Sequence, residues 1–135
     1  MGIRWVRLKN ATLHPVIEWK VQAAKRKYRK IHYKCAITSL EKDPRTGKKV
    51  EVHHKVPVHV RPDLACDPDN LESLLPCMHF WAGHLGHLGR GWLDYNKNLP
   101  ETIRALRAEF NRRAESGKFD PSVDLGPASC DDAMK

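Results

Sequence analysis

The sequence predicts an α+β protein, in which a core of a β-hairpin plus a short helix is flanked by an N-terminal basic helix and a C-terminal helix. Two observations support this. Apolar residues recur at intervals of three and four near both ends of the chain, as on the buried face of an amphipathic helix. Between these stretches, strand-like runs flank a polar turn. The expected units are an N-terminal arm and basic helix over 1–32, a core over 33–88, a last helix over 89–117 and a flexible tail over 118–135.

The N-terminal unit begins with residues 1–12, which we expect to form a short strand or an irregular arm. Thr12 is suited to capping a helix and Pro15 to its first turn, so the helix is expected from there to about Ile31. One face of this helix is apolar and the other carries lysines and arginines. A basic face is often only solvated, but it also suits contacts with phosphate groups.

The core begins with two strand-like runs. Residues 33–39 predict a strand, residues 41–49 a polar hairpin turn and residues 49–56 the returning strand. Residues 57–69 hold three prolines and show no helical periodicity, which predicts a loop.

Two helices complete the predicted fold. A short one is expected after Pro76, from Met78 to about His84, where glycines follow. Pro100 opens the last helix, and Gly117 ends it. The segment beyond Gly117 lacks the pattern of a core.

The composition narrows the class of protein. Lysine and arginine number 24 against 16 aspartate and glutamate, which gives a net charge of +8 over 135 residues. Such an excess is typical of nucleic-acid-binding domains, although charge also serves solubility. No apolar run approaches the roughly 20 residues that span a membrane, and the N-terminus is too charged for a signal peptide. We therefore expect a cytoplasmic protein that does not bind membranes.

Two adjacent histidines, His53 and His54, lie near the end of the returning strand. Because neighbouring residues of a strand point to opposite faces, one can hold a metal ion while the other faces the chemistry beside it. Asn70-Leu71 and a third histidine, His79, follow along the chain. Each residue alone has a simpler interpretation: a half-exposed strand or core histidine, or, for Asn70, a turn or helix cap.

Taken together, these residues resemble the motif of the HNH nucleases, also called ββα-metal nucleases. That family has a His-His or Asp-His pair closing a strand, often a proline two or three residues later, then Asn-Leu, and a histidine nine residues after the asparagine. Here the pair is His53-His54, the proline is Pro57, and His79 stands nine residues after Asn70.

The resemblance covers about residues 33–88 and implies the roles of four residues. His53 and His79 would bind a metal ion, His54 would be the general base, and Asn70 would brace the loop or the base. Histidine can take a proton from water near neutral pH, and an ion with two protein ligands keeps positions open for phosphate oxygens. We expect a single-metal mechanism, since no cluster of carboxylates accompanies the motif.

The sequence does not determine which further residues bind the metal ion. His84 lies five residues after His79, off the line of a regular helix, and would reach the ion if the helix were broken at Gly83. His59 and His87 are weaker candidates. One divalent ion is expected, and the sequence does not decide between Mg²⁺, Mn²⁺, Zn²⁺ and Ni²⁺.

Many relatives bind a structural zinc ion through two Cys-x-x-Cys pairs. This chain has Cys35, but Thr38 stands where its mate would be, and Leu75 and Met78 replace the second pair. Cys77 is one position out of place, so a structural zinc ion is not expected, and Leu75 and Met78 are expected to fill the space by packing.

The expected partner is double-stranded DNA, and the resemblance implies a small nuclease of phages or mobile elements in a bacterial host cell. A phage packaging motor is compatible with it but is not indicated by any residue. The target sequence, the number of strands cut and the oligomeric state are not fixed by any motif. The candidate phosphate contacts are Lys25, Arg26, Arg29, Lys30, Lys55, Arg61 and Arg90.

Two other functions remain open. A non-catalytic metal-containing DNA-binding module would have the same fold, but it has little use for a base such as His54 beside a ligand. A zinc-stabilised structural domain is disfavoured by the missing cysteines. The sequence therefore favours a metal-dependent HNH endonuclease that hydrolyses phosphodiester bonds in DNA.

Overall fold

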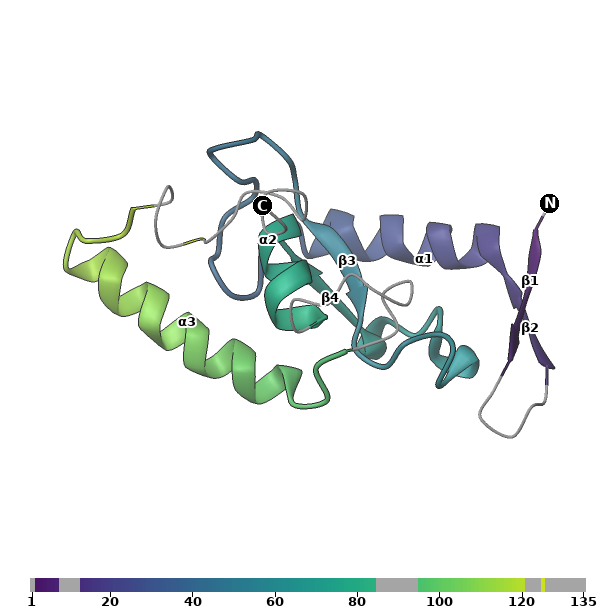
Figure 1. Ribbon diagram of the computed structural model, residues 1–135. Coiled ribbons are helices and arrows are strands. Elements are labelled where there is room, and N and C mark those ends of the chain that lie inside the picture. The colour runs from purple at the N-terminus through teal and green to yellow at the C-terminus, as the bar shows by residue number, and fades with distance from the viewer. Residues whose placement is uncertain (1, 8–12, 85–94, 121–124, 126–135) are drawn as a thin grey trace, which may run out of the picture.

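The computed structural model describes residues 2–7, 13–84, 95–120 and 125, and their mixture of helices and strands confirms the α+β class (Figure 1). None of the helices in these segments is long and apolar enough to cross a membrane. The helices and strands are β1 (Ile3–Arg7), β2 (Leu13–Ile17), α1 (Glu18–Ile31), β3 (Glu51–His54), β4 (Leu71–Leu74), α2 (Pro76–Met78) and α3 (Leu99–Glu115).

The first sheet is a hairpin of β1 and β2, so the first helix begins later than predicted. We expected Pro15 in the first turn of that helix, but it lies within β2, opposite Trp5. Thr12, the expected cap, lies outside the described residues. The strand is favoured here because β-branched Val16 suits an extended backbone and is buried in one cluster with Val6.

The second sheet pairs β3 with β4, placing Glu51 opposite Leu74 and His54 opposite Leu71. Residues 55–70 join the strands and include the predicted loop, which contains two short 3₁₀ turns. α2 follows β4 almost directly. α1 contacts both strands of this sheet, and Figure 1 shows α1 and α3 on opposite sides of it.

The partner of β3 differs from the one predicted. We expected residues 33–39 to pair with 49–56, but 33–39 form a turn. Ser39 has a φ of 63°, and its N–H donates to the carbonyl of Cys35 at 2.9 Å. Cys35 and Ile37 are nevertheless buried. The pattern that suggested a strand therefore reflects side chains packed into the core from a turn.

The polar turn predicted over 41–49 is present, and a buried carboxylate holds it. Lys42 and Lys49 pair across its base. Asp43 is 1% exposed, and its carboxylate accepts three hydrogen bonds from the backbone N–H and the guanidinium of Arg45. Burial acts to raise the pKa of Asp43, but the hydrogen bonds from Arg45 outweigh it and hold the pKa below its usual range.

The interior has two apolar clusters. The larger joins the segment around Cys35 to β4, α2 and α3, and it includes Leu75 and Met78, which are packed as expected. Cys35 and Cys77 are buried free thiols of this cluster. The smaller cluster brings the β1–β2 hairpin and α1 against Ala65 of the loop between β3 and β4.

The last helix is present as predicted. α3 begins at Leu99, and its partly buried Ile103 and Leu106 pack on the larger cluster. Gly117 follows with a φ of 70°, a conformation that favours glycine. The tail predicted over 118–135 lies mostly outside the described residues.

Replacing Asp43 tests the ion pair in the turn. In Asp43→Asn the charge facing Arg45 is lost, so we expect the free energy of unfolding at pH 7 to fall by about 2 kcal/mol. Because folding lowers the pKa of Asp43, its stabilisation is present above the unfolded pKa of about 3.9 and is lost as the pH falls through the folded value. Urea denaturation across this pH range should show the two proteins converging in acid.

The matched control is Asp63→Asn. Asp63 pairs with Arg61 at the surface, where the two side chains are 52% and 54% exposed. Because water screens this exposed pair, the variant should lose much less stability than Asp43→Asn. Equal losses in the two variants would contradict the role assigned to Asp43.

Candidate metal centre

β3 gives its two histidines different surroundings. His53 is 2% exposed and meets the helical segment that follows β4. His54 is half-buried and contacts the loop at Ala65. The alternation of side chains along a strand accounts for this separation.

His84 joins His53 and His79 through an unusual helical turn. Residues His79–Gly83 are π-helical, and the N–H of His84 donates to the carbonyl of His79 at 3.1 Å. A π turn spans one residue more than an α turn, so a residue five positions on returns to the same side. A break of the helix at Gly83 was expected to be necessary for this approach. The structure instead keeps the helix and widens it.

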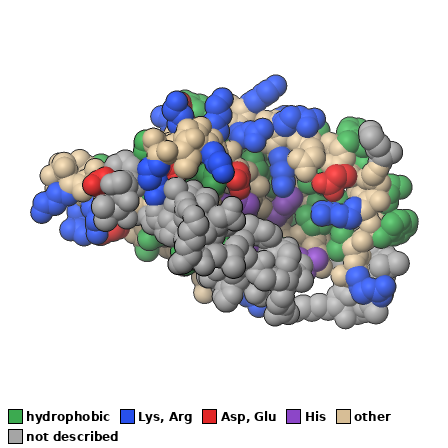
Figure 2. Space-filling view, turned by 45° about the horizontal axis from the view of Figure 1, so that its top comes forward, with side chains coloured by type: hydrophobic (Ala, Val, Ile, Leu, Met, Phe, Trp, Pro, Cys, Tyr) green, Lys and Arg blue, Asp and Glu red, His purple; other side chains and the backbone are tan. Residues whose placement is uncertain are grey.

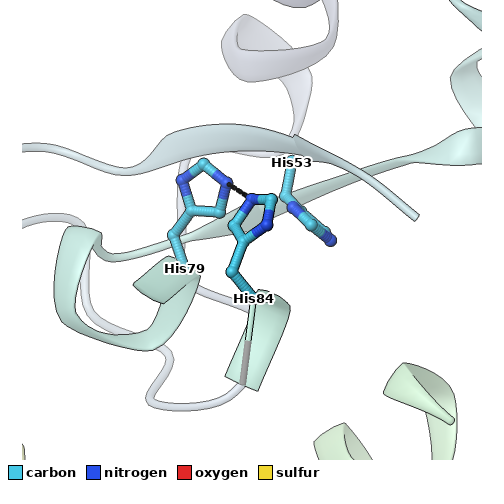
Figure 3. A group of neighbouring side chains, drawn as sticks. All are labelled: His53, His79 and His84. Carbon is cyan, nitrogen blue, oxygen red and sulfur yellow. Dashed lines mark hydrogen bonds between the residues drawn. The ribbon is translucent and has the colours of Figure 1, made fainter. Parts of the chain in front are cut away.

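The three imidazole rings form one compact group. Figure 3 shows His53 coming from β3, while His79 and His84 come from the helical turn and its end. Each pair of ring centres is 4.9 Å apart. One ring nitrogen of each residue lies within 4.8 Å of the others, and the Nε2 atoms of His79 and His84 are 3.1 Å apart.

Glu51 fixes the orientation of His79. Its carboxylate lies 2.7 Å from Nδ1 of His79, and the hydrogen bond from that ring lowers the pKa of Glu51. An ionised carboxylate only accepts, so Nδ1 carries the proton and Nε2 is left as a potential ligand on the side of His84. Glu51 was not among the site residues predicted from the sequence. Its place two residues before His53, on the same face of β3, was the available signal.

The donor set suits a metal ion. Nε2 of His53 is buried and has no hydrogen-bond partner within the part of the chain that the structure describes. Burial, together with the electrostatic effect of the adjacent imidazole rings of His79 and His84, lowers the pKa of His53 to about 2, so its ring is neutral at physiological pH. An unpartnered buried nitrogen is destabilising, and an ion that it ligates removes that cost. His53, His79 and His84 can therefore hold a metal ion.

The histidine group leaves little room for a side chain at Gly83. A Cβ atom there would lie 3.2 Å from Cε1 and Nδ1 of His53 and from Cδ2 of His79. Glycine at this position therefore lets the helical turn approach β3 closely enough for the three rings to meet.

His54 is oriented by the loop. A carbonyl oxygen only accepts, so Nε2 of His54 donates to the carbonyl of Ala65 at 2.8 Å, and Nδ1 keeps the lone pair. Burial lowers the pKa of His54, and the hydrogen bond to Ala65 acts in the opposite direction without cancelling it. The ring is therefore neutral at pH 7, with a defined tautomer.

Asn70 holds the two ends of the loop together. Its Oδ1 accepts from the N–H of Val56 at 2.9 Å, and its Nδ2 donates to the carbonyls of Val56 and Leu64 at 3.0 and 3.3 Å. Asn70 was expected to brace either the loop or the base. The hydrogen bonds of its side chain are those of a loop brace, which acts on His54 only through the loop.

A cavity of about 580 Å³ lies over the site. Its lining includes the four histidines His53, His54, His79 and His84, together with Arg4 of β1 and Lys25 of α1. His59 also lines it, whereas His87 lies outside the described residues. Figure 2 shows histidine side chains exposed on this face below a row of lysine and arginine side chains.

Part of the predicted basic face lies beside the histidines. Lys25, Arg26 and Arg29 of α1 line a second cavity, of about 260 Å³, that also includes His79. α1 therefore brings three of the predicted phosphate contacts next to the candidate ligands. Burial lowers the pKa of Lys25, and nearby Glu18 opposes this effect.

Other predicted contacts have acidic partners of their own. Nζ of Lys55 lies 3.9 Å from Oε2 of Glu72, and Nη2 of Arg61 lies 2.7 Å from Oδ2 of Asp63. Arg90 lies outside the described residues. The predicted contacts on α1 thus lie beside the histidines, whereas Lys55 and Arg61 of the loop lie close to carboxylates.

Comparison with protein-family models, with curated proteins and with solved structures finds no significant match to this chain.

A side chain at position 83 should weaken metal binding. In Gly83→Ala the added methyl group displaces the ring of His53 or His79, so we expect affinity for Zn²⁺ or Co²⁺ to fall at least about tenfold. Calorimetric titration of the metal-free protein measures this. Gly117→Ala is the control, because it strains the backbone at a φ of 70° but meets nothing within 4 Å. Wild-type affinity in Gly83→Ala would show that the rings do not bind the ion together.

Removing the partner of His79 should also weaken metal binding. Glu51→Ala leaves Nδ1 of His79 without its acceptor, so we expect a loss of about 10- to 100-fold in metal affinity. Glu51→Gln retains an accepting oxygen and should lose less. The same titration applies, and an unchanged affinity in Glu51→Ala would mean that His79 needs no support from β3.

Proposed function

We propose that this chain is a metal-dependent DNA endonuclease of the HNH type that hydrolyses phosphodiester bonds. The proposal is carried by two different histidine environments on one strand: a potential ligand group around His53 and, beside it, a neutral His54 of defined tautomer. Both line the same cavity. The order of strand, loop, strand and short helix around them supports a ββα-metal core.

His54 is suited to activate the attacking water. Its neutral ring takes a proton at Nδ1 while Nε2 continues to donate to Ala65. The protonated ring therefore keeps the orientation of the neutral one. A base with this geometry needs no movement of the loop during the reaction.

His53, His79 and His84 would hold the ion. When bound, the ion supplies positive charge for the scissile phosphate and the leaving oxygen. Three imidazole ligands leave at least one coordination position open, as catalytic sites require. Imidazole favours Zn²⁺ or Ni²⁺ over Mg²⁺, which prefers oxygen ligands, so we assign a transition metal to this site.

Basic side chains around the cavity suit the phosphates of DNA. Lys25 lines both the histidine cavity and the smaller cavity beside His79, and Arg4 lines the first of these. Such cations bind the backbone without regard to base sequence. We therefore assign the substrate to DNA and leave the choice of sequence to contacts outside the motif.

Plasmid cleavage tests the role of His54. Wild-type protein with Zn²⁺, Ni²⁺ or Mn²⁺ should nick or cut supercoiled plasmid faster than with Mg²⁺, and EDTA should abolish this activity. His54→Ala should lower the rate by about 10²- to 10⁴-fold, because it removes the base. Its metal affinity should stay at the wild-type value, because His54 is not among the three ligands.

His32→Ala is the matched control. His32 is an exposed histidine that stacks on Tyr28 and lines none of the cavities beside the site. This variant should cut at the wild-type rate. Equal cleavage by wild type and His54→Ala would exclude His54 as the base. A gel shift of the plasmid without cutting would instead favour the non-catalytic DNA-binding module.

A further inference from the structure

Three cavities follow one another along α1. The histidine cavity shares Lys25 and His79 with the smaller cavity beside it, and the smaller cavity shares Arg26 and Arg29 with a third cavity of about 430 Å³. The three cavities are therefore neighbours, and their order runs from the histidine group toward the C-terminal end of α1.

The third cavity is a basic basin between α1 and the polar turn. Five of its eight lining residues are lysine or arginine, and one is acidic, so its charge favours an anion. The cations are Arg26, Arg29 and Lys30 from α1 and Lys42 and Lys49 from the turn, and the acidic residue is Glu41.

The backbone of the turn fixes the positions of Lys42 and Lys49 relative to each other. Lys42 and Lys49 are bridged through their backbones, and the carboxylate of Asp43 next to them is buried and paired with Arg45. Among the described residues, no carboxylate lies within ion-pair distance of either lysine. Their charge is therefore available to an external anion, unlike that of Arg61.

We propose that this basin binds the phosphate backbone of DNA that lies along α1, beside the histidine group and away from the reacting phosphate. This inference rests on the proposed function for the identity of the anion. An α-helix rises about 1.5 Å per residue, so Lys25 and Lys30 are about 7.5 Å apart along the axis, or roughly two base-pair steps. DNA placed on the histidine group and aligned with α1 therefore passes over the basin.

Such a contact has a definite effect on the reaction. It strengthens binding and fixes the position of the duplex, but it touches neither the attacking water nor the leaving oxygen. Removal of the turn lysines should thus raise KM and leave kcat nearly unchanged. The polar turn, which the sequence analysis assigned only as a connection, becomes part of the DNA-binding surface.

The salt dependence of DNA binding tests this proposal. Binding of a fluorescent duplex of about 30 base pairs is measured in EDTA, without cleavage, over a range of salt concentrations. Each phosphate contact contributes about 0.9 to the slope of log K against log salt. In Lys42→Gln/Lys49→Gln, the steepness of this slope should fall by about 1.8. Plasmid cleavage by the same variant should show the raised KM at an unchanged kcat.

The matched control is Arg107→Gln/Lys118→Gln. Both residues are exposed, lie on or after α3 and line none of the three cavities, and the change in net charge is the same. Equal slopes in the two double variants would overturn the basin as a specific contact. If wild type binds DNA but does not cut it, the endonuclease proposal fails. The comparison of the salt slopes of the two double variants still shows whether the basin binds DNA.

Discussion

The antiparallel pairing of β3 with β4 is the constraint on which both halves of the site depend. Because side chains alternate along β3, His53 enters the ligand group while His54 faces the loop. The same pairing returns the chain at Asn70, whose amide closes the loop on Val56. A shift of β3 by one residue would exchange the faces of the two histidines, and neither would meet its partners.

The N-terminal elements complete this arrangement from the other side of the loop. Val6, Val16 and Val21 bury Ala65, and the carbonyl of Ala65 orients the ring of His54. The helix that carries the basic face therefore also supports His54, the proposed base. The proposed binding of DNA along α1 and the position of His54 are therefore linked through this small cluster.

Local spacing along the chain predicted some features of the structure correctly. The positions of His53 and His79 sufficed to predict that these two side chains meet, and the apolar stripe with Gly117 sufficed for α3. The prediction failed where tertiary contacts override local preference. Leu71–Leu74 contains leucine and glutamate, which favour helices, and only pairing with β3 makes it a strand. Residues 33–39 likewise look extended but pack as a turn. The contact of Glu51 with His79 could not be predicted, because the sequence does not show which side chain of the helical turn lies against β3.

A π-helical turn is an α-helical turn with one inserted residue. Histidines four positions apart in an ordinary helix and five apart in a π turn therefore present their rings on the same side. Loss of one residue between His79 and His84 would turn the second arrangement into the first without replacing either histidine. A search pattern with one fixed spacing between the two histidines would find only one of two chains that differ by this inserted residue. Both chains would nevertheless present the same pair of imidazole rings. Related sites are better sought with both spacings allowed.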